Sequence, residues 1–223
     1  MRVAVHVQQQ REIISFLQEQ LRRHLAAMLL FWLSIVVLAA FAWMRPLSAP
    51  PPLAVALVQS SSTTGSSFFV GNGLFVTSAR VVGADKEVTL RLPQGAAFTA
   101  QVQFSDLESD VAVLRASAVD PTLAPLPLGD AASLSDGEPV QVAGYVADVY
   151  ALTPMTIVRR AGGALELSVE GTPGESGGPV IRTSDQTVVG MVVSRLRGTD
   201  TRQQALPINT IEAVSTARQF PIR

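Results

Sequence analysis

The chain has 223 residues and a formal net charge of −1, which suits one ordinary domain with an additional segment. Its 17 basic and 18 acidic residues give no overall positive charge, so we expect no nucleic-acid partner. It has no cysteine, which excludes disulfides and cysteine nucleophiles, and no histidine cluster, so we expect no metal site and no cofactor.

The first predicted element is a membrane-spanning helix at residues 25–44. This stretch, LAAMLLFWLSIVVLAAFAWM, contains Ser34 as its only polar residue. A helix of this length extends about 30 Å, which matches the hydrocarbon core of a bilayer. A buried core helix is seldom apolar on every face over such a length, so a membrane span is the better interpretation.

The charges that flank residues 25–44 predict the orientation of this helix. Four arginines precede it, whereas Arg45 is the only basic residue that follows it closely. By the positive-inside rule, we expect residues 1–24, an amphipathic segment, in the cytoplasm and the C-terminal part in the periplasm of a bacterium. The apolar stretch is too long for most cleaved signal peptides, the alternative, so we expect an uncleaved signal anchor in the cytoplasmic (inner) membrane.

Short strands separated by turns dominate the rest of the sequence. Residues 45–52, RPLSAPPP, form a proline-rich stretch that we expect to be an extended linker. Beyond it, stretches rich in β-branched and aromatic residues alternate with turn sequences such as GNG, PQG and SDG, which predicts an all-β barrel or sandwich. The predicted strands cover residues 53–58, 66–70, 73–78, 87–92, 98–104, 111–115, 138–145, 156–160, 164–169 and 187–194.

A short helix is expected near the C-terminus, within the sequence NTIEAVSTARQF. Asn209 is its expected N-cap, because Glu212 follows three residues later as in a capping box. Ile211 and Val214 fall on one face of this helix and are expected to pack on the strands.

Five stretches of the chain resemble, in the same order, those of a known protease family. They are GSSFFVGNGLFVTSARVV, ESDVAVLR, LPLGDAASLSDGEPVQVAGY, GESGGPV and ALPINT. Residues 53–223 are therefore similar to the protease domain of HtrA/Deg-type trypsin-like serine proteases. The resemblance implies two packed six-stranded β-barrels followed by a short helix. No PDZ domain is expected after it, because the sequence ends at Arg223.

The same resemblance implies the residues of the active site. The nucleophile falls on Ser176, the orienting aspartate on Asp110, and the oxyanion donors on the N–H groups of Gly174 and Ser176. The general base, a histidine in the family, falls on Arg80, and 110 − 80 = 30 residues is the family's usual separation. A guanidinium stays protonated and offers no acceptor, so Arg80 is a degenerate base position. We expect Arg80 instead to pair with Asp110 and to face the oxyanion donors, as a receptor for a carboxylate.

No other residue of the sequence is a convincing substitute for the missing base. The only histidines, His6 and His24, precede the predicted span on its cytoplasmic side. Lys86 would require an unrelated serine–lysine geometry, and the side chain of Glu175 is expected to point away from the hydroxyl beside it.

These features favour a membrane-anchored pseudoprotease that acts as a binding or scaffold subunit, with protein partners in a larger membrane complex. The alternative is an active serine endopeptidase that uses Ser176 with a base supplied by a partner or with a non-standard mechanism. A third hypothesis, a signalling protein, is least favoured, because the short cytoplasmic segment contains no output domain.

Overall fold

The computed structural model of the protein describes most of the sequence after residue 53. The described residues are 54–170, 172–193 and 202–222, together with His24, Met28 and Trp32. The chain divides into two compact units, Met1–Pro51 and Pro52–Arg223. All the strands of the described residues belong to the second unit.

Little of the first unit is described. His24, Met28 and Trp32 are helical and exposed. The predicted amphipathic segment, transmembrane helix and proline-rich linker otherwise lie outside the described residues. Within the part of the chain that is described, no helix combines the length and the apolar character needed to cross a bilayer. The transmembrane helix therefore stays a prediction.

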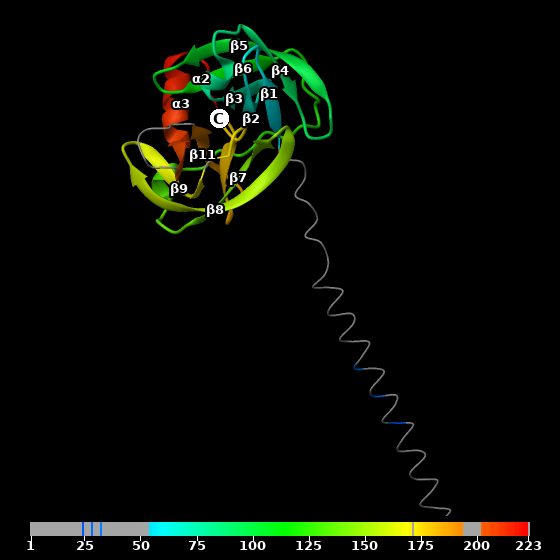
Figure 1. The fold of residues 1–223 in the computed structure, drawn as a ribbon, viewed down its shortest axis with the longest axis vertical. Helices are drawn as coiled ribbons and strands as arrows, with labels where there is room; N and C mark the ends of the chain where they lie inside the picture. Colours follow the sequence, from blue (N-terminus) through cyan, green and yellow to red (C-terminus); the bar gives the residue numbers. More distant parts are fainter. Residues whose placement is uncertain are drawn as a thin grey trace, which may run out of the picture. The chain divides into compact units, whose positions relative to one another are not determined.

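Six antiparallel strands form the first β-barrel of the second unit (Figure 1). These strands are β1 (Val55–Gln59), β2 (Thr64–Gly71), β3 (Leu74–Thr77), β4 (Glu87–Arg91), β5 (Ala97–Asp106) and β6 (Val111–Ala116). They hydrogen-bond in the order β1-β2-β3-β6-β5-β4, and β1 closes the barrel by pairing with β4. Turn residues at positive φ, Asn72 and Gly95 among them, reverse the chain between neighbouring strands.

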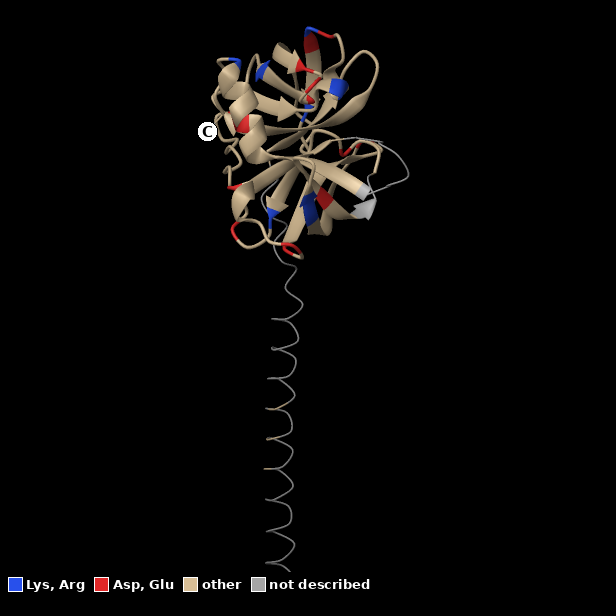
Figure 2. Ribbon diagram, turned by 90° about the vertical axis from the view of Figure 1, so that its left-hand side faces the viewer, with Lys and Arg blue, Asp and Glu red and all other residues tan. Residues whose placement is uncertain are grey.

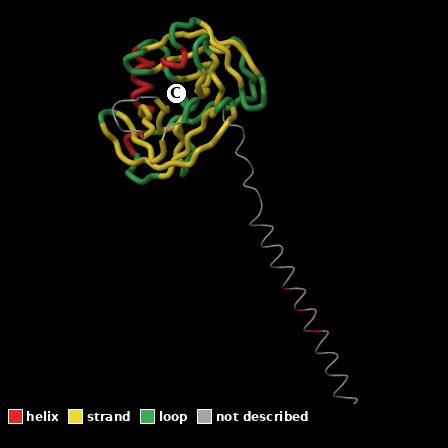
Figure 3. The backbone as a smooth tube through the Cα atoms, in the orientation of Figure 1, coloured by secondary structure: helices red, strands yellow, loops and turns green. Residues whose placement is uncertain are grey.

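The second barrel repeats the arrangement of the first. Its strands are β7 (Pro139–Val146), β8 (Val149–Ala161), β9 (Ala164–Glu170), β10 (Pro179–Arg182), β11 (Val188–Val193) and β12 (Arg202–Pro207). Their order is β10-β11-β12-β9-β8-β7, and β10 closes the barrel on β7. Figure 3 shows how strands make up most of both barrels. The predicted all-β fold of two six-stranded barrels is confirmed.

Apolar side chains fill the interior of both barrels. All four residues of β3 and all six residues of β11 are buried. The largest fully buried side chains include Phe68 and Phe75 of the first barrel and Ile157 and Met191 of the second. Burying one such side chain stabilises the fold by about 1.5–3 kcal/mol. The loops between the barrels are therefore attached to well-packed strands.

Among the described residues, two short α-helices and one 3₁₀ turn complete the unit. Helix α2 (Ala79–Val82) follows β3, and a 3₁₀ turn, η1 (Ala131–Ser133), precedes β7. Helix α3 (Ile208–Ala217) contacts β6 of the first barrel as well as β11 and β12 of the second. The predicted C-terminal helix is confirmed, and it connects the two barrels.

The predicted N-cap of α3 is wrong. The cap residue is Pro207, and no side chain caps the helix. The Asn209 side chain instead accepts a hydrogen bond from the Ala131 N–H at 2.9 Å and donates one to Asp130 at 3.1 Å. The Asn209 side chain thus makes a tertiary contact at η1 and does not cap α3, contrary to the prediction from the local sequence pattern.

The strand β8 begins earlier than the predicted strand at 156–160. Pro154 lies within it, opposite Gln141 of β7, and a proline normally argues against a strand. From Val149 to Thr156, however, β8 pairs only with β7, and its pairing with β9 starts at Ile157. Among the described residues, no strand pairs with β8 on that side, so the missing N–H of Pro154 is tolerated.

Candidate active site

The nucleophile loop, Gly174 to Gly178, precedes β10 and is fixed against the first barrel. The Ser66 N–H of β2 donates to the Ser176 carbonyl at 2.8 Å, and the Ser66 hydroxyl donates to the Gly174 carbonyl at 2.7 Å. The Gly178 N–H donates to the Glu175 carbonyl at 2.8 Å, which closes a tight turn. Ser176 stays partly exposed on this turn.

Glycine is required at position 177 of the loop. The φ angle of Gly177 is +86°, a conformation that L side chains rarely adopt. A Cβ atom there would lie 2.2 Å from the Ser66 carbonyl oxygen and 2.4 Å from the Thr77 hydroxyl oxygen. The missing side chain therefore allows the loop to approach β2 and β3 closely.

The N–H groups of Gly174 and Ser176 are the predicted oxyanion donors. Gly174 follows Pro173 at φ 101°, and the Glu175 N–H donates to the Thr172 carbonyl at 3.2 Å, as in a type II turn. Within the described residues, neither the Gly174 N–H nor the Ser176 N–H donates a hydrogen bond to a protein acceptor. Both donors are available to an oxygen atom of a ligand.

Asp110 is held by the start of α2 in the first barrel. It is fully buried and has a φ of 58°. Its Oδ1 accepts hydrogen bonds from the Ser78 hydroxyl at 2.7 Å and from the Arg80 N–H at 3.1 Å. The Ser78 hydroxyl also caps α2, because it accepts from the Arg80 N–H at 3.3 Å. Asp110 is thus positioned by the backbone of residue 80, whichever side chain that residue carries.

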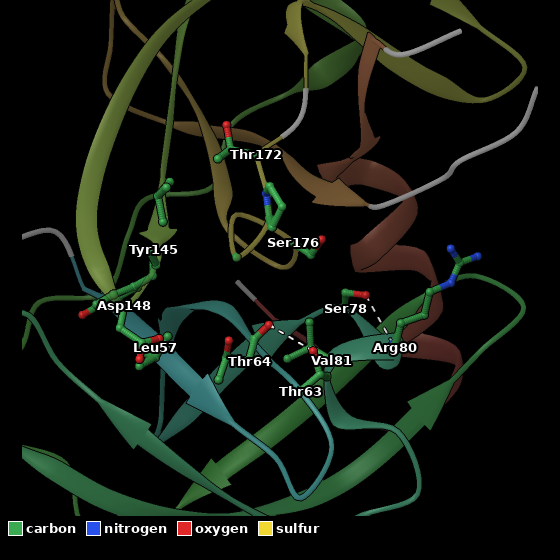
Figure 4. A pocket seen from close by; sticks show the side chains of 14 residues that line it. Leu57, Thr63, Thr64, Ser78, Arg80, Val81, Tyr145, Asp148, Thr172 and Ser176 are labelled. Atoms are coloured by element: carbon green, nitrogen blue, oxygen red, sulfur yellow. Dashed lines mark hydrogen bonds between the residues drawn. The ribbon is translucent and has the colours of Figure 1, made fainter. Parts of the chain in front are cut away.

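The Arg80 side chain departs from the expected arrangement. Its Nε lies 3.8 Å from Asp110 Oδ2, so the expected pairing is a long ion pair without a charge-assisted hydrogen bond. Asp110 Oδ2 is buried and accepts no hydrogen bond from the described residues. The Arg80 side chain is 48% exposed, and Figure 4 shows it extending away from Ser176 rather than facing the oxyanion donors. A half-exposed guanidinium keeps part of its hydration, which favours this outward position.

A buried network around Glu175 was not predicted from the sequence. The Glu175 carboxylate accepts hydrogen bonds from the Thr153 hydroxyl at 3.0 Å, the Gln203 amide at 2.9 Å and the Thr172 N–H at 3.2 Å. These contacts join the nucleophile loop to β8 and β12, and they hold the carboxylate away from Ser176. The expectation that Glu175 points away from the hydroxyl is therefore confirmed.

A cavity of about 750 Å³ lies beside the nucleophile loop (Figure 4). It is bounded by the nucleophile loop, the start of α2, the β1–β2 turn and the tip of the β7–β8 hairpin. Its lining residues are Leu57, Thr63, Thr64, Ser78, Arg80, Val81, Tyr145, Val146, Ala147, Asp148, Thr172, Pro173, Gly174 and Ser176. The structure thus brings Arg80, Gly174 and Ser176 to one cavity, with Asp110 buried behind Ser78.

Tyr145 lines this cavity, and its ring packs edge-on against Tyr150, with 5.8 Å between the ring centroids. Burial raises the pKa of both phenols to about 12. The Tyr145 hydroxyl also donates to the Arg91 carbonyl at 3.1 Å. Both phenols therefore stay protonated at neutral pH, and neither serves as a general base.

Sequence comparison relates this chain to proteases. The family model described as trypsin-like peptidase domain matches residues 65–191. The chain is 41% identical over 83 residues to the mitochondrial serine protease HTRA2 of Bos taurus. It is 32% identical over 140 residues to a probable periplasmic serine endoprotease, DegP-like, of Hahella chejuensis (strain KCTC 2396). The matches cover 37% and 58% of this chain but only 18% and 29% of these two relatives.

Solved structures share the fold. The HtrA-type protease AlgW with a tripeptide superposes with a TM-score of 0.65 at 21% identity, covering 74% of this chain and 60% of AlgW. The serine endoprotease from Yersinia pestis gives a TM-score of 0.66 at 20% identity, covering 75% of this chain and 63% of that protease. Since the matched family model covers more than half of the chain, this protein belongs to the trypsin-like peptidase domain family and has the fold of the HtrA-type proteases.

Proposed function

We propose that this protein is a catalytically inactive trypsin-like domain, a pseudoprotease, that acts by binding other proteins. The observation that carries the proposal is Arg80, whose N–H lies 3.1 Å from Asp110 Oδ1 at the position of the general base. A serine hydroxyl becomes a nucleophile only when a base accepts its proton, and a guanidinium has no acceptor. In a serine protease, removal of the base lowers turnover by about 10⁶-fold.

The positions and contacts of the other candidate bases support this proposal. No histidine follows His24 in the sequence. Lys86 is exposed immediately before β4 and does not line the cavity. Glu175 is buried and already accepts hydrogen bonds from Thr153 and Gln203. None of these three kinds of candidate therefore offers a base to Ser176.

We further propose that the domain is anchored in the cytoplasmic membrane of a bacterium and works in the periplasm as a subunit of a larger membrane complex. The apolar residues 25–44 and the excess of arginines before them support the anchor and its orientation. The name of the relative from Hahella chejuensis, a probable periplasmic endoprotease, is consistent with this location. The cavity beside Ser176 supports a role in binding proteins, because the position of the general base is occupied by Arg80.

An active serine endopeptidase is the second candidate function. Ser176 is partly exposed, Asp110 keeps its backbone contacts, and the N–H groups of Gly174 and Ser176 have no protein acceptor within the described residues. A base supplied by a partner would then complete the site.

Labelling with a fluorophosphonate probe distinguishes the two candidates. We expect no labelling of the unaltered 223-residue chain and labelling at Ser176 in the Arg80→His variant, because histidine would stand next to Asp110. Arg80→His combined with Ser176→Ala is the matched control and should stay unlabelled. Labelling of Ser176 in the unaltered chain would contradict the pseudoprotease proposal and favour the endopeptidase.

A further inference from the structure

The described part of the cavity beside the nucleophile loop contains one basic and one acidic residue. Among the described residues that line it, Arg80 is the only basic residue and Asp148 is the only acidic one. Figure 4 shows the two on opposite sides of the cavity, with Ser176 between them. On the ribbon as a whole, by contrast, residues of both signs are scattered over both barrels (Figure 2). The cavity therefore suits a ligand with an anionic group and a cationic group some distance apart.

The side of the cavity near Ser176 is suited to an anion. The N–H groups of Gly174 and Ser176 have no protein acceptor within the described residues, and the hydrogen bonds of Ser66 to this loop fix its backbone. Arg80 also lines the cavity, and its side chain extends away from these donors. The fixed N–H donors of Gly174 and Ser176 therefore favour a carboxylate on this side of the cavity.

The opposite side is formed by the tip of the β7–β8 hairpin. Val146 pairs with Val149, so Ala147 and Asp148 form a two-residue turn, and both have positive φ angles, 47° and 64°. Ala147 and Asp148 are exposed, and Val149 is 68% exposed. Positive φ is unfavourable for alanine, and such strain often occurs where a loop binds a ligand. The hairpin thus presents the acidic side chain of Asp148 and the apolar side chain of Ala147 at the cavity.

The size and the lining of the cavity limit the length and polarity of the ligand segment between its two charged groups. A space of 750 Å³ is about 11 Å across, and an extended chain advances about 3.3 Å per residue, so it holds about three residues. Its walls include the apolar side chains of Leu57, Val81, Val146 and Pro173. The segment between the charges is therefore expected to be short and apolar.

We propose that this cavity binds the C-terminal tail of a partner polypeptide. The terminal carboxylate accepts hydrogen bonds from the N–H groups of Gly174 and Ser176, and a lysine or arginine about three residues earlier lies against Asp148. A terminal carboxylate is the end of the backbone itself. An extended tail can therefore place its carboxylate at the Gly174 and Ser176 N–H groups and its basic side chain at Asp148 without the peptide chain reversing direction. The inference rests on the proposed function, because an active protease would use the same N–H groups in hydrolysis.

Binding of labelled peptides to the whole 223-residue chain tests this inference. The probe is an N-terminally fluorescein-labelled octapeptide that ends in Arg-Ala-Val-Leu with a free carboxylate, and fluorescence anisotropy reports its affinity. We expect the matching C-terminal amide to bind at least about tenfold more weakly, because charge-assisted hydrogen bonds are lost. Equal affinities of acid and amide would overturn the inference.

Variants of Asp148 test the opposite side of the cavity. We expect replacement of the peptide arginine by glutamate to weaken binding by about threefold or more to the unaltered chain. The Asp148→Arg variant should reverse this preference. Asn tolerates positive φ, so the Asp148→Asn variant should fold normally and discriminate less between the two peptides. Asp136 lies at a turn outside the cavity, so the control variant Asp136→Asn should behave as the unaltered chain. Unchanged discrimination in Asp148→Arg would overturn the position of the basic residue.

Mass spectrometry of the same mixtures shows whether the peptides are hydrolysed or only bound. Hydrolysis of either peptide at a rate abolished by Ser176→Ala would contradict the proposed function itself. Equal affinities without hydrolysis would contradict only the binding of a C-terminal tail.

Discussion

The two halves of the site differ in how strongly the fold constrains them. The nucleophile loop of the second barrel is fixed by hydrogen bonds to Ser66, by the close approach of Gly177 to β2 and β3, and by the buried carboxylate of Glu175. At the base position of the first barrel, the N–H of residue 80 is fixed by Asp110, whereas the Arg80 side chain is 48% exposed and lies 3.8 Å from Asp110.

This difference indicates which residues can change without loss of the fold. A substitution within the nucleophile loop disturbs contacts between the two barrels, so it affects stability as well as function. A substitution of the side chain at residue 80 leaves the hydrogen bonds of Ser78 and Asp110 intact, because they involve the N–H of residue 80. Catalysis can therefore be lost at this position while the structure is retained.

The largest effect is expected for Gly177→Ala. The new Cβ atom would lie 2.2 Å from the Ser66 carbonyl oxygen at a φ of +86°, so we expect a loss of about 4 kcal/mol in the free energy of unfolding. Gly162→Ala is the matched control, because Gly162 also has positive φ but nothing lies within 4 Å of its Cβ position. It should lose only about 1 kcal/mol. Urea denaturation measures both, and equal losses would contradict steric locking of the loop.

Ser66→Ala should destabilise the protein by about 2–3 kcal/mol, because two buried hydrogen bonds are lost. The Ser66 hydroxyl donates to the Gly174 carbonyl at 2.7 Å and accepts from the Tyr145 N–H at 2.9 Å. Ser67 is equally buried but makes one longer hydrogen bond, 3.3 Å, to the Ala56 carbonyl, so Ser67→Ala should lose about 1 kcal/mol. Thermal or urea unfolding with the opposite ranking would show that Ser66 does not hold the loop.

A double-mutant cycle between Arg80→Gln and Asp110→Asn should give a coupling energy below about 1 kcal/mol. Asn keeps the Oδ1 acceptor and tolerates the φ of 58°, so the cycle isolates the long ion pair. Arg159 and Glu166 provide a comparison, because they form two hydrogen bonds of 2.8 and 2.9 Å. Their coupling should be larger, and a stronger coupling at Arg80 would mean that this position is more constrained than its exposure indicates.

The smallest effect is expected at a surface ion pair outside both halves of the site. The hydrogen bond from Arg218, 2.9 Å from Asp106, lowers the pKa of that carboxyl group. Because the folded-state pKa is depressed, its contribution to stability is present above the ordinary pKa, about 4, and is lost as the pH falls through the folded-state pKa. Arg218→Gln should raise the pKa of Asp106 in an NMR titration and weaken this acid-dependent loss. An unchanged pKa would show that the pair does not form in solution.

Most of the fold follows from the sequence, because strand patterns and turn glycines act locally. The predicted turns at GNG, PQG and SDG contain residues at positive φ, namely Gly71, Asn72, Gly73, Gly95 and Gly137. The first half of β8 was missed because Pro154 is tolerated only through the one-sided pairing of that strand. The cap of α3 was wrong because Asn209 contacts η1, which is distant in the sequence.

The site was predicted less completely, because side-chain directions depend on tertiary contacts. The resemblance to HtrA-type proteases and the spacing of Arg80, Asp110 and Ser176 identified the residues that lie at or near the cavity. They did not predict that the Arg80 side chain points outward. The hydrogen bonds of Glu175 join the nucleophile loop to β8 and β12, which are distant in the sequence. The glutamate itself was the only feature of the sequence that indicated this network. Asp148 is one of several exposed acidic residues and becomes notable only beside the cavity.

The position of Ser66 also has a mechanical consequence. The second unit begins at Pro52, and its first strand, β1, pairs with β2 so that Leu57 lies opposite Ser66. Ser66 in turn bonds directly to the nucleophile loop. Tension applied to the chain before residue 52 enters the domain through β1 and is transmitted across one strand pair to the carbonyl groups of Gly174 and Ser176. A pull on the chain before residue 52 thus acts on the same loop that provides the N–H groups of Gly174 and Ser176 to the cavity.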